Sequence, residues 1–372
     1  MSPFDLTPQP GESVDWSAVE SQLPWFATMI GVEQSPRYHA EGDVHTHVKM
    51  VVDDLVASPA WAERDPDSRA DLFVAALFHD LGKVYCTRRE DDGSITSRGH
   101  AERGSVLARQ ELWRCGVPFE RRERVCAVVR WHMLPFHLVS RSEANRLSYR
   151  VAETVRWEDV LTHATSDARG RICDDLDDIL DRVQLAREWV EAAGCAAKNY
   201  GFPDDHARVL YFRGDRAHPD VPTWEPRRLT VTLLSGLPGA GKDRWIERER
   251  GHSPVVSLDR IRARLKVDPT DNQGRVVQAA REAAREHLRD GRDFVWNATH
   301  LSRRLRSLSI SLCLQYGARV EIVYVESPAS RLFAQNRRRP DAVPEGAIDR
   351  LLRRWEVPDR TEAHAVQFVT GD

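Results

Sequence analysis

Residues 235–243 read Ser-Gly-Leu-Pro-Gly-Ala-Gly-Lys-Asp and follow a run of β-branched and apolar side chains. Gly236, Gly241 and Lys242 have the Gly-x-x-x-x-Gly-Lys spacing of a loop that wraps nucleotide phosphates. Glycines let successive backbone N–H groups point at anionic oxygens, and the lysine adds a mobile positive charge. The pattern therefore predicts a site for ATP (or another NTP). Its expected ligands are Gly236, Gly239, Ala240, Gly241, Lys242 and Asp243.

A second set of potential ligands lies in the first half of the chain. His79 and Asp80 adjoin at the end of an expected helix, where an imidazole and a carboxylate can share one ion. A His-Asp pair by itself usually lies at a solvent-exposed helix end and binds nothing. Here, however, the neighbouring expected helices carry further candidate ligands: His45, His47, His100, His132 and Asp167. Mixed imidazole and carboxylate ligands suit Mn²⁺, Fe²⁺, Co²⁺ or Ni²⁺. An ion of this kind activates water and polarises a phosphoryl oxygen.

The order His, His-Asp, His, His, Asp resembles the HD superfamily of metal-dependent phosphohydrolases. Residues 99–102 and 166–171 resemble the HD domains appended to bacterial CCA-adding enzymes. The resemblance implies that one metal ion is held by four side chains, namely His47, His79, Asp80 and Asp167. It also implies that His100 and His132 hold a second metal ion or the substrate phosphate. Lys83 and Arg171 would then neutralise phosphate charge.

The other histidines of this half are expected to have ordinary roles. Of the two early candidates, His47 is preferred as the ligand because Thr46 precedes it, as in the helix start typical of that superfamily, and His45 is taken as a neighbour. His39, His137 and His163 are expected to be surface or core residues.

Asp259 follows an expected strand at residues 255–258, and Arg262 lies one helical turn further on. Ligands of parallel α/β sheets bind at the carboxyl ends of the strands, so Asp259 is placed to accept the proton of an acceptor hydroxyl. The alternative is that Asp259 caps the helix that follows it. Residues 257–262 resemble phage-type polynucleotide kinases. That resemblance implies that Asp259 activates a 5′-hydroxyl and that Arg262 contacts the acceptor's 3′-phosphate.

Two further segments carry the kinase resemblance. Residues 336–340, Asn-Arg-Arg-Arg-Pro, form a basic turn similar to the lid of those kinases, and Arg338 is preferred by spacing for the transferring phosphate. The alternative is that this arginine run only forms a solvent-exposed face of the protein. The third expected strand ends at Asn297, where many such kinases carry aspartate, and Asp243 replaces the usual Ser or Thr. We hypothesise that Asp243 supplies the carboxylate that the Mg²⁺ site would otherwise lack.

The elements that must position these residues differ between the two halves. From residue 43 to about 194 the apolar spacing is helical, with no convincing alternating strand. Helices are expected at residues 15–23, 44–55, 72–83, 100–115, 119–131, 143–153, 157–168 and 175–193. Later, expected strands at 229–235, 255–258, 294–296 and 320–325 alternate with helices. This predicts a multidomain chain, with an all-α HD-type domain before an α/β P-loop kinase domain that has a parallel sheet.

Composition sets the remaining limits. A chain of 372 residues with 41% hydrophobic content is large enough to fill two hydrophobic cores. Its net charge of −3 does not indicate an overall basic surface of the kind that binds nucleic acid. Six cysteines without a Cys-x-x-Cys pair favour a reducing cytoplasm, and neither a secretory signal nor a membrane-spanning run is present. The expected divisions are an N-terminal extension (1–40), an HD phosphohydrolase domain (41–195), a connector (196–227) and a P-loop kinase domain (228–372).

Together the halves resemble bifunctional enzymes that heal nucleic-acid ends. The resemblance implies ATP-dependent phosphorylation of 5′-OH ends and hydrolysis of 2′,3′-cyclic, 2′- or 3′-phosphate ends of RNA and/or DNA. The products suit a nucleic-acid ligase as the functional partner, and no membrane partner is expected. Two alternatives stay open: a small-molecule (nucleoside or sugar) kinase fused to an HD nucleotidase, and a non-catalytic ATP-switched RNA-binding regulator.

Overall fold

The computed structural model describes residues 2–224, 229–268, 271–338 and 342–371. The chain divides into two compact units, Met1–Tyr200 and Gly201–Asp372. Residues 225–228, where the expected connector ends and the expected kinase domain begins, lie outside the described part. The finer division into four segments stays a prediction. The segment expected to be a connector contains helix α11 (Asp205–Arg213), and Arg208 of this helix donates hydrogen bonds to the backbone carbonyls of Ala363 and His364 in the second unit.

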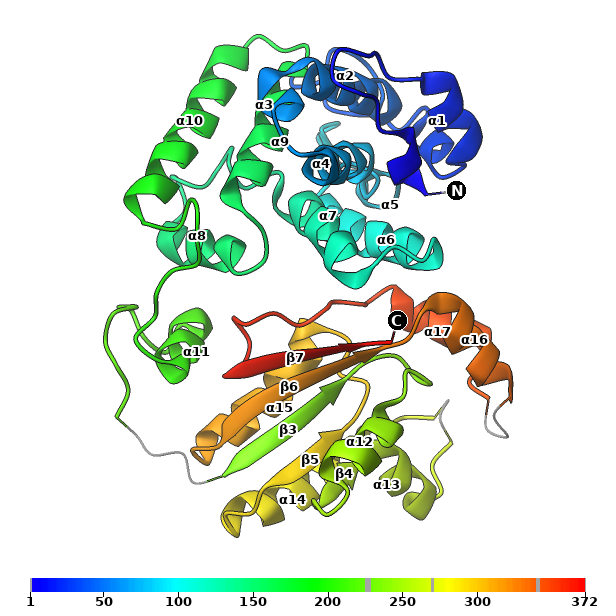
Figure 1. Cartoon of the computed structure of the whole chain (residues 1–372), viewed down its shortest axis with the longest axis vertical. Helices are drawn as coiled ribbons and strands as arrows, with labels where there is room; N and C mark the ends of the chain where they lie inside the picture. Colours follow the sequence, from blue (N-terminus) through cyan, green and yellow to red (C-terminus); the bar gives the residue numbers. More distant parts are fainter. Residues whose placement is uncertain (1, 225–228, 269–270, 339–341, 372) are drawn as a thin grey trace. The chain divides into compact units, whose positions relative to one another are not determined.

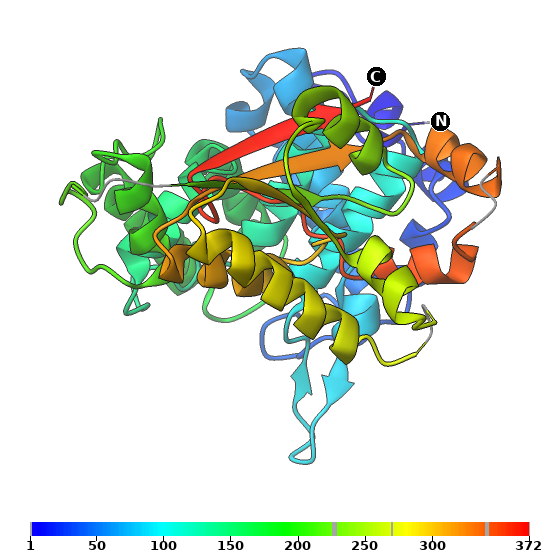
Figure 2. The same ribbon diagram turned by 90° about the horizontal axis from the view of Figure 1, so that it is seen from below.

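The first unit is built from helices (Figure 1). Its α-helices are α1 (Trp16–Gln22), α2 (Val44–Ala57), α3 (Pro59–Ala62), α4 (Pro66–Phe78), α5 (Lys83–Cys86), α6 (His100–Arg114), α7 (Phe119–Trp131), α8 (Ala144–Ala152), α9 (Trp157–Arg169) and α10 (Leu176–Ala192), with 3₁₀ turns at Pro3–Leu6 and Phe26–Met29. The expectation that this half has no strand is wrong in one place. A short antiparallel hairpin, β1 (Arg88–Arg89) with β2 (Ile95–Thr96), projects from the helices (Figure 2).

Helix α2 shows how the chain directs a polar residue inward. The Asp43 carboxylate caps this helix by accepting a hydrogen bond from the Thr46 N–H at 2.9 Å. Its valines at helical spacing are fully buried, and His47 lies on the same buried face. Helix α9 approaches α2 very closely at Gly170, where a Cβ atom would lie 2.7 Å from the Val51 nitrogen. Because only glycine fits there, His47 is held beside the end of α9.

Helices α6 and α7 are held together by a largely buried ion pair. Arg109 of α6 lies 2.8 Å from the Glu123 carboxylate of α7, which also accepts a hydrogen bond from Arg122 at 2.8 Å. Burial opposes the charge of Glu123, but the two guanidinium groups outweigh it and lower the pKa of that carboxyl. The pairing fixes α6 against α7, so that His100 at the start of α6 meets His132 at the end of α7.

The second unit contains a five-stranded parallel sheet in the order β4-β5-β3-β6-β7 (Figure 1). The strands are β3 (Thr230–Ser235), β4 (Val255–Ser257), β5 (Phe294–Asn297), β6 (Arg319–Glu326) and β7 (Ala365–Thr370). The helices that alternate with them are α12 (Lys242–Arg250), α13 (Leu258–Leu265), α14 (Gly274–Arg289), α15 (Arg303–Gln315), α16 (Ala329–Arg338) and α17 (Glu345–Leu352). The predicted fold class is confirmed, although β7 was not predicted.

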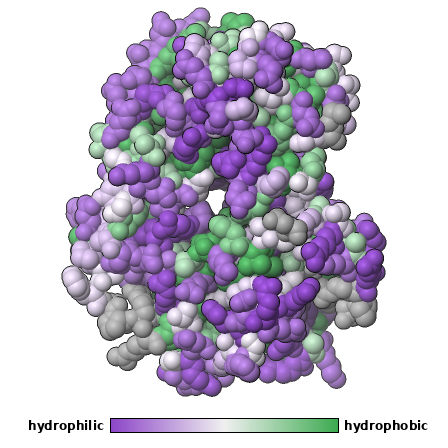
Figure 3. All heavy atoms as spheres, in the orientation of Figure 1, coloured by the Kyte–Doolittle hydropathy of each residue, from purple (hydrophilic) through white to green (hydrophobic). Residues whose placement is uncertain are grey.

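Apolar side chains of both units are largely withdrawn into cores. In the second unit, alternate residues of β3 such as Val231 and Leu233 pack with Val276 of α14 and Ile310 of α15. Hydrophilic side chains cover much of the visible surface, with small apolar groups between them (Figure 3). Among the described residues, no helix combines the length and the apolar composition that a bilayer crossing requires.

Candidate active sites

The six predicted metal ligands of the first unit meet around the Asp80 carboxylate. Its Oδ2 atom lies 3.3 Å from His79 Nε2 and 3.7 Å from His47 Nε2. Its Oδ1 atom lies 3.3 Å from His100 Nε2 and 3.8 Å from His132 Nε2. Asp167 joins on the first side, with Oδ1 3.2 Å from His47 Nε2. The cluster therefore has two halves that share Asp80.

Backbone hydrogen bonds orient three of the imidazoles. The Nδ1 atoms of His79, His100 and His132 each lie 2.8 Å from a backbone carbonyl three residues earlier. Each Nδ1–H donates to that carbonyl, so the Nε2 lone pair faces the cluster. This arrangement is typical of histidines that bind metal ions.

The cluster contains buried polar atoms that have no hydrogen bond. Among the described residues, no hydrogen-bond partner is present for Nε2 of His47 and His79, Oδ1 of Asp80 and Oδ2 of Asp167. Leaving such atoms unsatisfied is costly, so converging orphan atoms indicate a ligand. Three groups each have their ligand atoms within 4.8 Å of one another: His47–His79–Asp80 and Asp80–His100–His132 in the cluster, and His39–Glu41–His47 beside it. Nitrogen and carboxylate donors in this number fit one or two mid-row divalent cations.

The protonation states also suit metal ligation. Burial lowers the pKa of His100 and lowers that of His132 well below its usual range. Burial opposes the charge of Asp80 and Asp167, yet nearby cations outweigh it and hold the pKa of both carboxyls well below the usual range. At neutral pH His100 and His132 thus offer neutral imidazoles, and Asp80 and Asp167 offer ionised carboxylates, the forms that bind metal ions. His47 differs, because burial opposes its charge but hydrogen bonds to Asp167 and Glu41 outweigh burial and raise its pKa.

The two predicted phosphate-neutralising cations adjoin the cluster. Lys83 Nζ lies 2.6 Å from Asp80 Oδ2 and donates a hydrogen bond to Gln34 Oε1 at 2.7 Å. Arg171 Nη2 lies 2.8 Å from Asp167 Oδ1, and its guanidinium stacks over the Phe136 ring. Each cation offsets the charge of one buried carboxylate.

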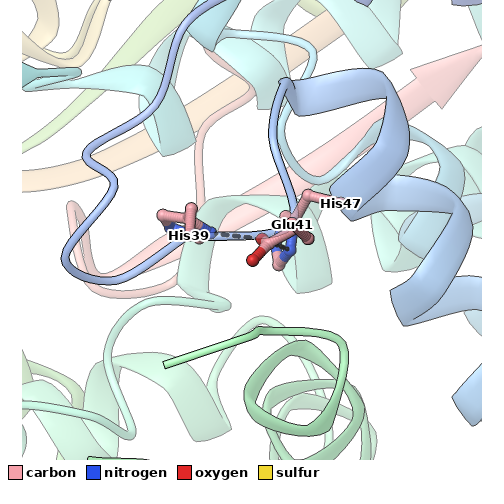
Figure 4. Close-up of side chains that lie close together, drawn as sticks. All are labelled: His39, Glu41 and His47. Carbon is pink, nitrogen blue, oxygen red and sulfur yellow. Dashed lines mark hydrogen bonds and ion pairs between the residues drawn. The ribbon is translucent and has the colours of Figure 1, made fainter. Parts of the chain in front are cut away.

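Sequence reasoning missed a carboxylate behind His47. Glu41 Oε1 lies 2.8 Å from His39 Nδ1 and 2.9 Å from His47 Nδ1 (Figure 4). Its Oε2 atom accepts a hydrogen bond from the Ile172 N–H. Burial opposes its charge, but these hydrogen bonds prevail and lower the pKa of Glu41. Glu41 thereby orients His47, as a carboxylate behind a metal-binding histidine commonly does.

His163 was expected to be a core or surface residue, and it is buried against the cluster. Its ring centroid lies 5.0 Å from that of His79 and 5.8 Å from that of His132. Burial lowers the pKa of His163 to about 3, so the imidazole is neutral. Its position four residues before Asp167 on one helix face was the available sequence signal.

A pocket of about 560 Å³ opens beside the cluster. Its lining combines residues of the cluster with residues of the hairpin and α7, among them His39, Lys83, Ile95, Arg98, His100, Arg130, His137 and Arg141. Most charged side chains of this lining are cations. The pocket therefore suits an anionic substrate.

In the second unit the predicted phosphate loop has the required backbone. Gly236, Gly239 and Gly241 have φ angles of 147°, 81° and 104°, which favour glycine. A Cβ atom on Gly236 would lie 2.2 Å from the Val325 carbonyl oxygen. Helix α12 begins at Lys242, whose Nζ donates hydrogen bonds to the carbonyls of Gly236 and Leu237 at 3.0 and 2.9 Å. Ala240 is buried between the glycines.

Asp243 and Asn297, the two residues that differ from the usual kinase pattern, are hydrogen-bonded to each other. Asn297 Nδ2, at the end of β5, donates a hydrogen bond to Asp243 Oδ1 in the first turn of α12 at 2.7 Å. The compensation hypothesis requires this proximity. The role of Asp243 at Mg²⁺ stays a hypothesis.

The predicted acceptor residues lie at the start of α13. Ser257 caps this helix by accepting a hydrogen bond from the Arg260 N–H, so the reading of Asp259 as the cap is wrong. β4 ends at Ser257, one residue earlier than expected. The Asp259 side chain is 86% exposed and forms an ion pair with Arg262, which also donates a hydrogen bond to Gln273. Asp259 is thus an accessible carboxylate with a cation beside it.

The predicted lid is only partly described. Arg338 is the last residue of α16 and is exposed, and Arg337 lies 3.5 Å from Glu345. Arg339 and Pro340 lie outside the described residues. A pocket of about 290 Å³ adjoins the phosphate loop and contains residues that sequence reasoning missed, namely Arg244, Trp245, Arg248 and Arg331. Most charged side chains of this lining are cations, which suit an anionic group.

Comparison with known families agrees with this geometry. Residues 46–180 match the family model described as HD domain, and residues 231–358 match that described as AAA domain. The first unit therefore contains an HD domain. The second unit carries a P-loop domain that resembles kinases.

Several curated proteins are similar to parts of the chain. The Multifunctional CCA protein of Halorhodospira halophila is 33% identical over 31% of this chain and 25% of its own length. The protein of the same name from Cupriavidus metallidurans is 31% identical over 54% of this chain and 47% of its own length. The CC-adding tRNA nucleotidyltransferase of Thermus thermophilus is 34% identical over 37% of this chain and 34% of its own length. This chain therefore spans less than half the length of these relatives. A solved Chloroflexus aurantiacus structure described as a candidate kinase aligns with 39% of this chain and 87% of its own at 12% identity and a TM-score of 0.30, too loosely to carry an argument.

Proposed function

We propose that this chain heals broken nucleic-acid ends. Its HD domain would hydrolyse 2′,3′-cyclic, 2′- or 3′-phosphate ends, and its P-loop domain would use ATP to phosphorylate 5′-OH ends. The observation that carries the proposal is the pairing, in one chain, of a metal-ligand cluster around Asp80 with a phosphate loop ahead of an accessible carboxylate. The products, 5′-phosphate and 3′-hydroxyl ends, are the substrates of a nucleic-acid ligase.

At the HD site, His47, His79, Asp80 and Asp167 would hold a divalent ion such as Mn²⁺, Co²⁺, Ni²⁺ or Fe²⁺. That ion would supply Lewis-acid activation of water and of the phosphoryl oxygen. Lys83 and Arg171 then offset the charge of the phosphate together with that of the carboxylates. His100 and His132 face the other Asp80 oxygen, where they orient the phosphate or hold a second ion.

At the kinase site, the N–H groups of the loop and Lys242 bind the nucleotide phosphates. Asp243 and Asn297 organise Mg²⁺. Asp259 accepts the proton of the attacking 5′-hydroxyl, and Arg262 contacts the 3′-phosphate of the acceptor nucleotide. Arg338 stabilises the charge on the transferring phosphoryl group, a role in which a cation commonly contributes several orders of magnitude in rate.

The relatives support nucleic acid over a metabolite as the substrate. One of them is named as a nucleotidyltransferase that acts on tRNA, which favours RNA ends for the matching part of this chain. A sugar or nucleoside kinase fused to an HD nucleotidase is the competing function.

Both activities can be assayed on full-length protein with oligonucleotides that end in 5′-OH or in 2′,3′-cyclic phosphate, as RNA and as DNA. We expect Asp80→Ala to abolish phosphate release and to leave phosphorylation of 5′-OH ends intact. Lys242→Ala should do the reverse, so each variant serves as the folding control for the other. Loss of both activities in each variant would contradict two independent sites. Phosphorylation of nucleosides or sugars but of no oligonucleotide would support the competing function.

A further inference from the structure

We infer that the pocket beside the Asp80 cluster binds the last nucleotides of a strand, not only its terminal phosphate. Arg98 and Arg141 would contact backbone phosphates, and Tyr38 would stack on a base. The inference rests on the proposed phosphoesterase function and specifies its substrate as an oligonucleotide.

The pocket is far larger than a phosphate group requires. Its volume of about 560 Å³ lies in the range, roughly 300–1,000 Å³, of sites that enclose a whole small organic ligand. The lining extends from His100 at the cluster, past Ile95 of the hairpin, to Arg141 beyond α7. A substrate that fills this space must extend well beyond the reacting phosphorus.

The cations of the lining fall into two groups. Lys83 is paired with Asp80, and Arg130 lies 2.5 Å from Glu102, the acidic residue of the lining. Arg98 and Arg141 are exposed, and among the described residues no ion-pair partner is present for either guanidinium. Most arginines of the first unit have such partners. Two unpaired guanidinium groups facing one pocket suit phosphate oxygens, which they can bind with two parallel hydrogen bonds each.

These arginines lie beyond the residues that the terminal phosphate needs. Lys83 and Arg171 already adjoin the carboxylates of the cluster. A nucleoside 2′,3′-cyclic phosphate carries one phosphate and would leave Arg98 and Arg141 without a partner. An oligonucleotide supplies further phosphates upstream of its end.

An aromatic ring completes this lining. Tyr38 borders the same pocket and is 39% exposed, with the Arg37 guanidinium 5.2 Å from its ring centroid. Aromatic rings next to a cationic groove are the usual means of binding single strands, because every base has a face that can stack. The composition of the lining therefore favours a single-stranded end with little sequence preference.

The test compares two substrates that share the reacting group. One is a pentanucleotide that ends in 2′,3′-cyclic phosphate, and the other is a nucleoside 2′,3′-cyclic phosphate. KM is measured for both at several KCl concentrations with full-length protein and Mn²⁺. The variants are Arg98→Ala, Arg141→Ala and the double variant, with Lys198→Ala as a control that removes an exposed charge outside the pocket.

We expect the pentanucleotide KM to rise steeply with salt and the nucleoside KM to change little. Each arginine substitution should reduce the slope of log KM against log salt by about 0.7, the contribution of one single-strand phosphate contact. Neither should alter the nucleoside KM, which shows that the variants fold. Tyr38→Ala should raise the KM of both substrates by about fivefold or more, because the terminal base is common to them.

The outcomes separate this inference from the function on which it rests. If wild-type protein hydrolyses both substrates with equal KM and equal salt dependence, and the arginine variants match Lys198→Ala, the inference is overturned and the phosphoesterase function stands. If wild-type protein hydrolyses neither substrate, the proposed function fails and the inference fails with it.

Discussion

The ligand cluster of the HD domain takes its side chains from helices far apart in sequence, from His47 in α2 to Asp167 in α9. The phosphate loop of the second unit is one continuous turn from Gly236 to Lys242. In the cluster, the polar atoms belong to buried side chains whose geometry depends on helix packing. In the loop they belong to the backbone, and their geometry depends on a few glycine φ angles.

This difference affects how complete each site is before substrate binds. The Asp80 cluster is enclosed, its imidazoles are oriented, and its carboxylates are ionised beside cations. Asp259, the carboxylate proposed to accept the acceptor's proton, is exposed, and Arg338 lies at the exposed end of α16. We therefore expect the HD site to be preorganised, whereas the kinase site would be completed by its substrates.

Metal removal should separate the two sites most strongly. Protein stripped with a chelator should lose phosphate release by on the order of 10³-fold, since Lewis-acid activation supplies several kcal/mol. Kinase activity should return with Mg²⁺ alone. Mn²⁺ at about 100 times its Kd should stabilise the HD domain by about 2.7 kcal/mol, measured as a rise in its thermal unfolding midpoint. The same rise in Asp80→Asn protein would show that Mn²⁺ binds elsewhere.

Glu123→Gln tests the dependence of the cluster on helix packing. This change leaves Arg109 and Arg122 without their shared carboxylate and should cost about 3–5 kcal/mol of unfolding free energy at neutral pH. Because the folded-state pKa of Glu123 is lowered, its stabilisation is present above the ordinary glutamate pKa of about 4.3 and is lost as pH falls through the folded value.

The gap between wild type and Glu123→Gln should therefore close on acidification, as measured by urea unfolding at a series of pH values. Glu191→Gln, a change at an exposed residue of α10, is the matched control. A gap that is independent of pH would mean that the carboxylate charge does not hold α6 against α7.

Glu41→Gln tests whether the Glu41 carboxylate orients His47, a single predicted metal ligand. The amide can still accept a hydrogen bond from His47, but the charge that orients the ring is lost. We expect Mn²⁺ affinity to fall by about 10–100-fold, the usual range for such partners. The stripped protein should also lose stability at neutral pH, because the hydrogen bonds that lower the pKa of Glu41 stabilise the folded state. Mn²⁺ titration followed by thermal unfolding measures this, with Glu191→Gln again as the control. Unchanged affinity would make Glu41 a structural residue only.

The fold was largely predictable because long amphipathic helices have a strong period. Helix α7 has the predicted bounds, Phe119–Trp131, and the helix at α9 was one residue short. The hairpin was missed because its strands have two residues each, too few for an alternating pattern. β7 was missed because it is half exposed and its pattern carries no continuous apolar run.

The cluster was predictable only as an order of residue types. His47 to Asp167 could be named because the order of these residue types along the chain resembles that of the HD superfamily. Glu41 could not, because it lies in a loop, where sequence spacing does not determine which side chains meet. The unpaired state of Arg98 and Arg141 likewise depends on which acids the fold brings near them.

The smallest expected effect concerns the pair Asp243 and Asn297. Both differ from the residues that are usual at these positions of such kinases. The Asn297 amide donates to Asp243, so the loop depends here on a side chain from another strand, as the HD cluster does throughout. Asp243→Ser restores the usual hydroxyl but leaves no carboxylate, and we expect the turnover rate of the kinase reaction to fall by about tenfold, or ~1.4 kcal/mol. Adding Asn297→Asp should recover part of this, measured at saturating ATP across Mg²⁺ concentrations.

Asn297→Asp alone provides the decisive comparison for that pair. It places a second carboxylate within hydrogen-bonding distance of Asp243, and like charges this close oppose each other unless a cation lies between them. Bound Mg²⁺ relieves this repulsion, so we expect this variant to reach half-maximal turnover at a lower Mg²⁺ concentration than the double variant does. Equal turnover rates and equal Mg²⁺ dependence in wild type and all three variants would show that neither side chain organises the ion. The phosphate loop would then depend only on its own backbone, whereas the HD cluster depends on side chains from several helices.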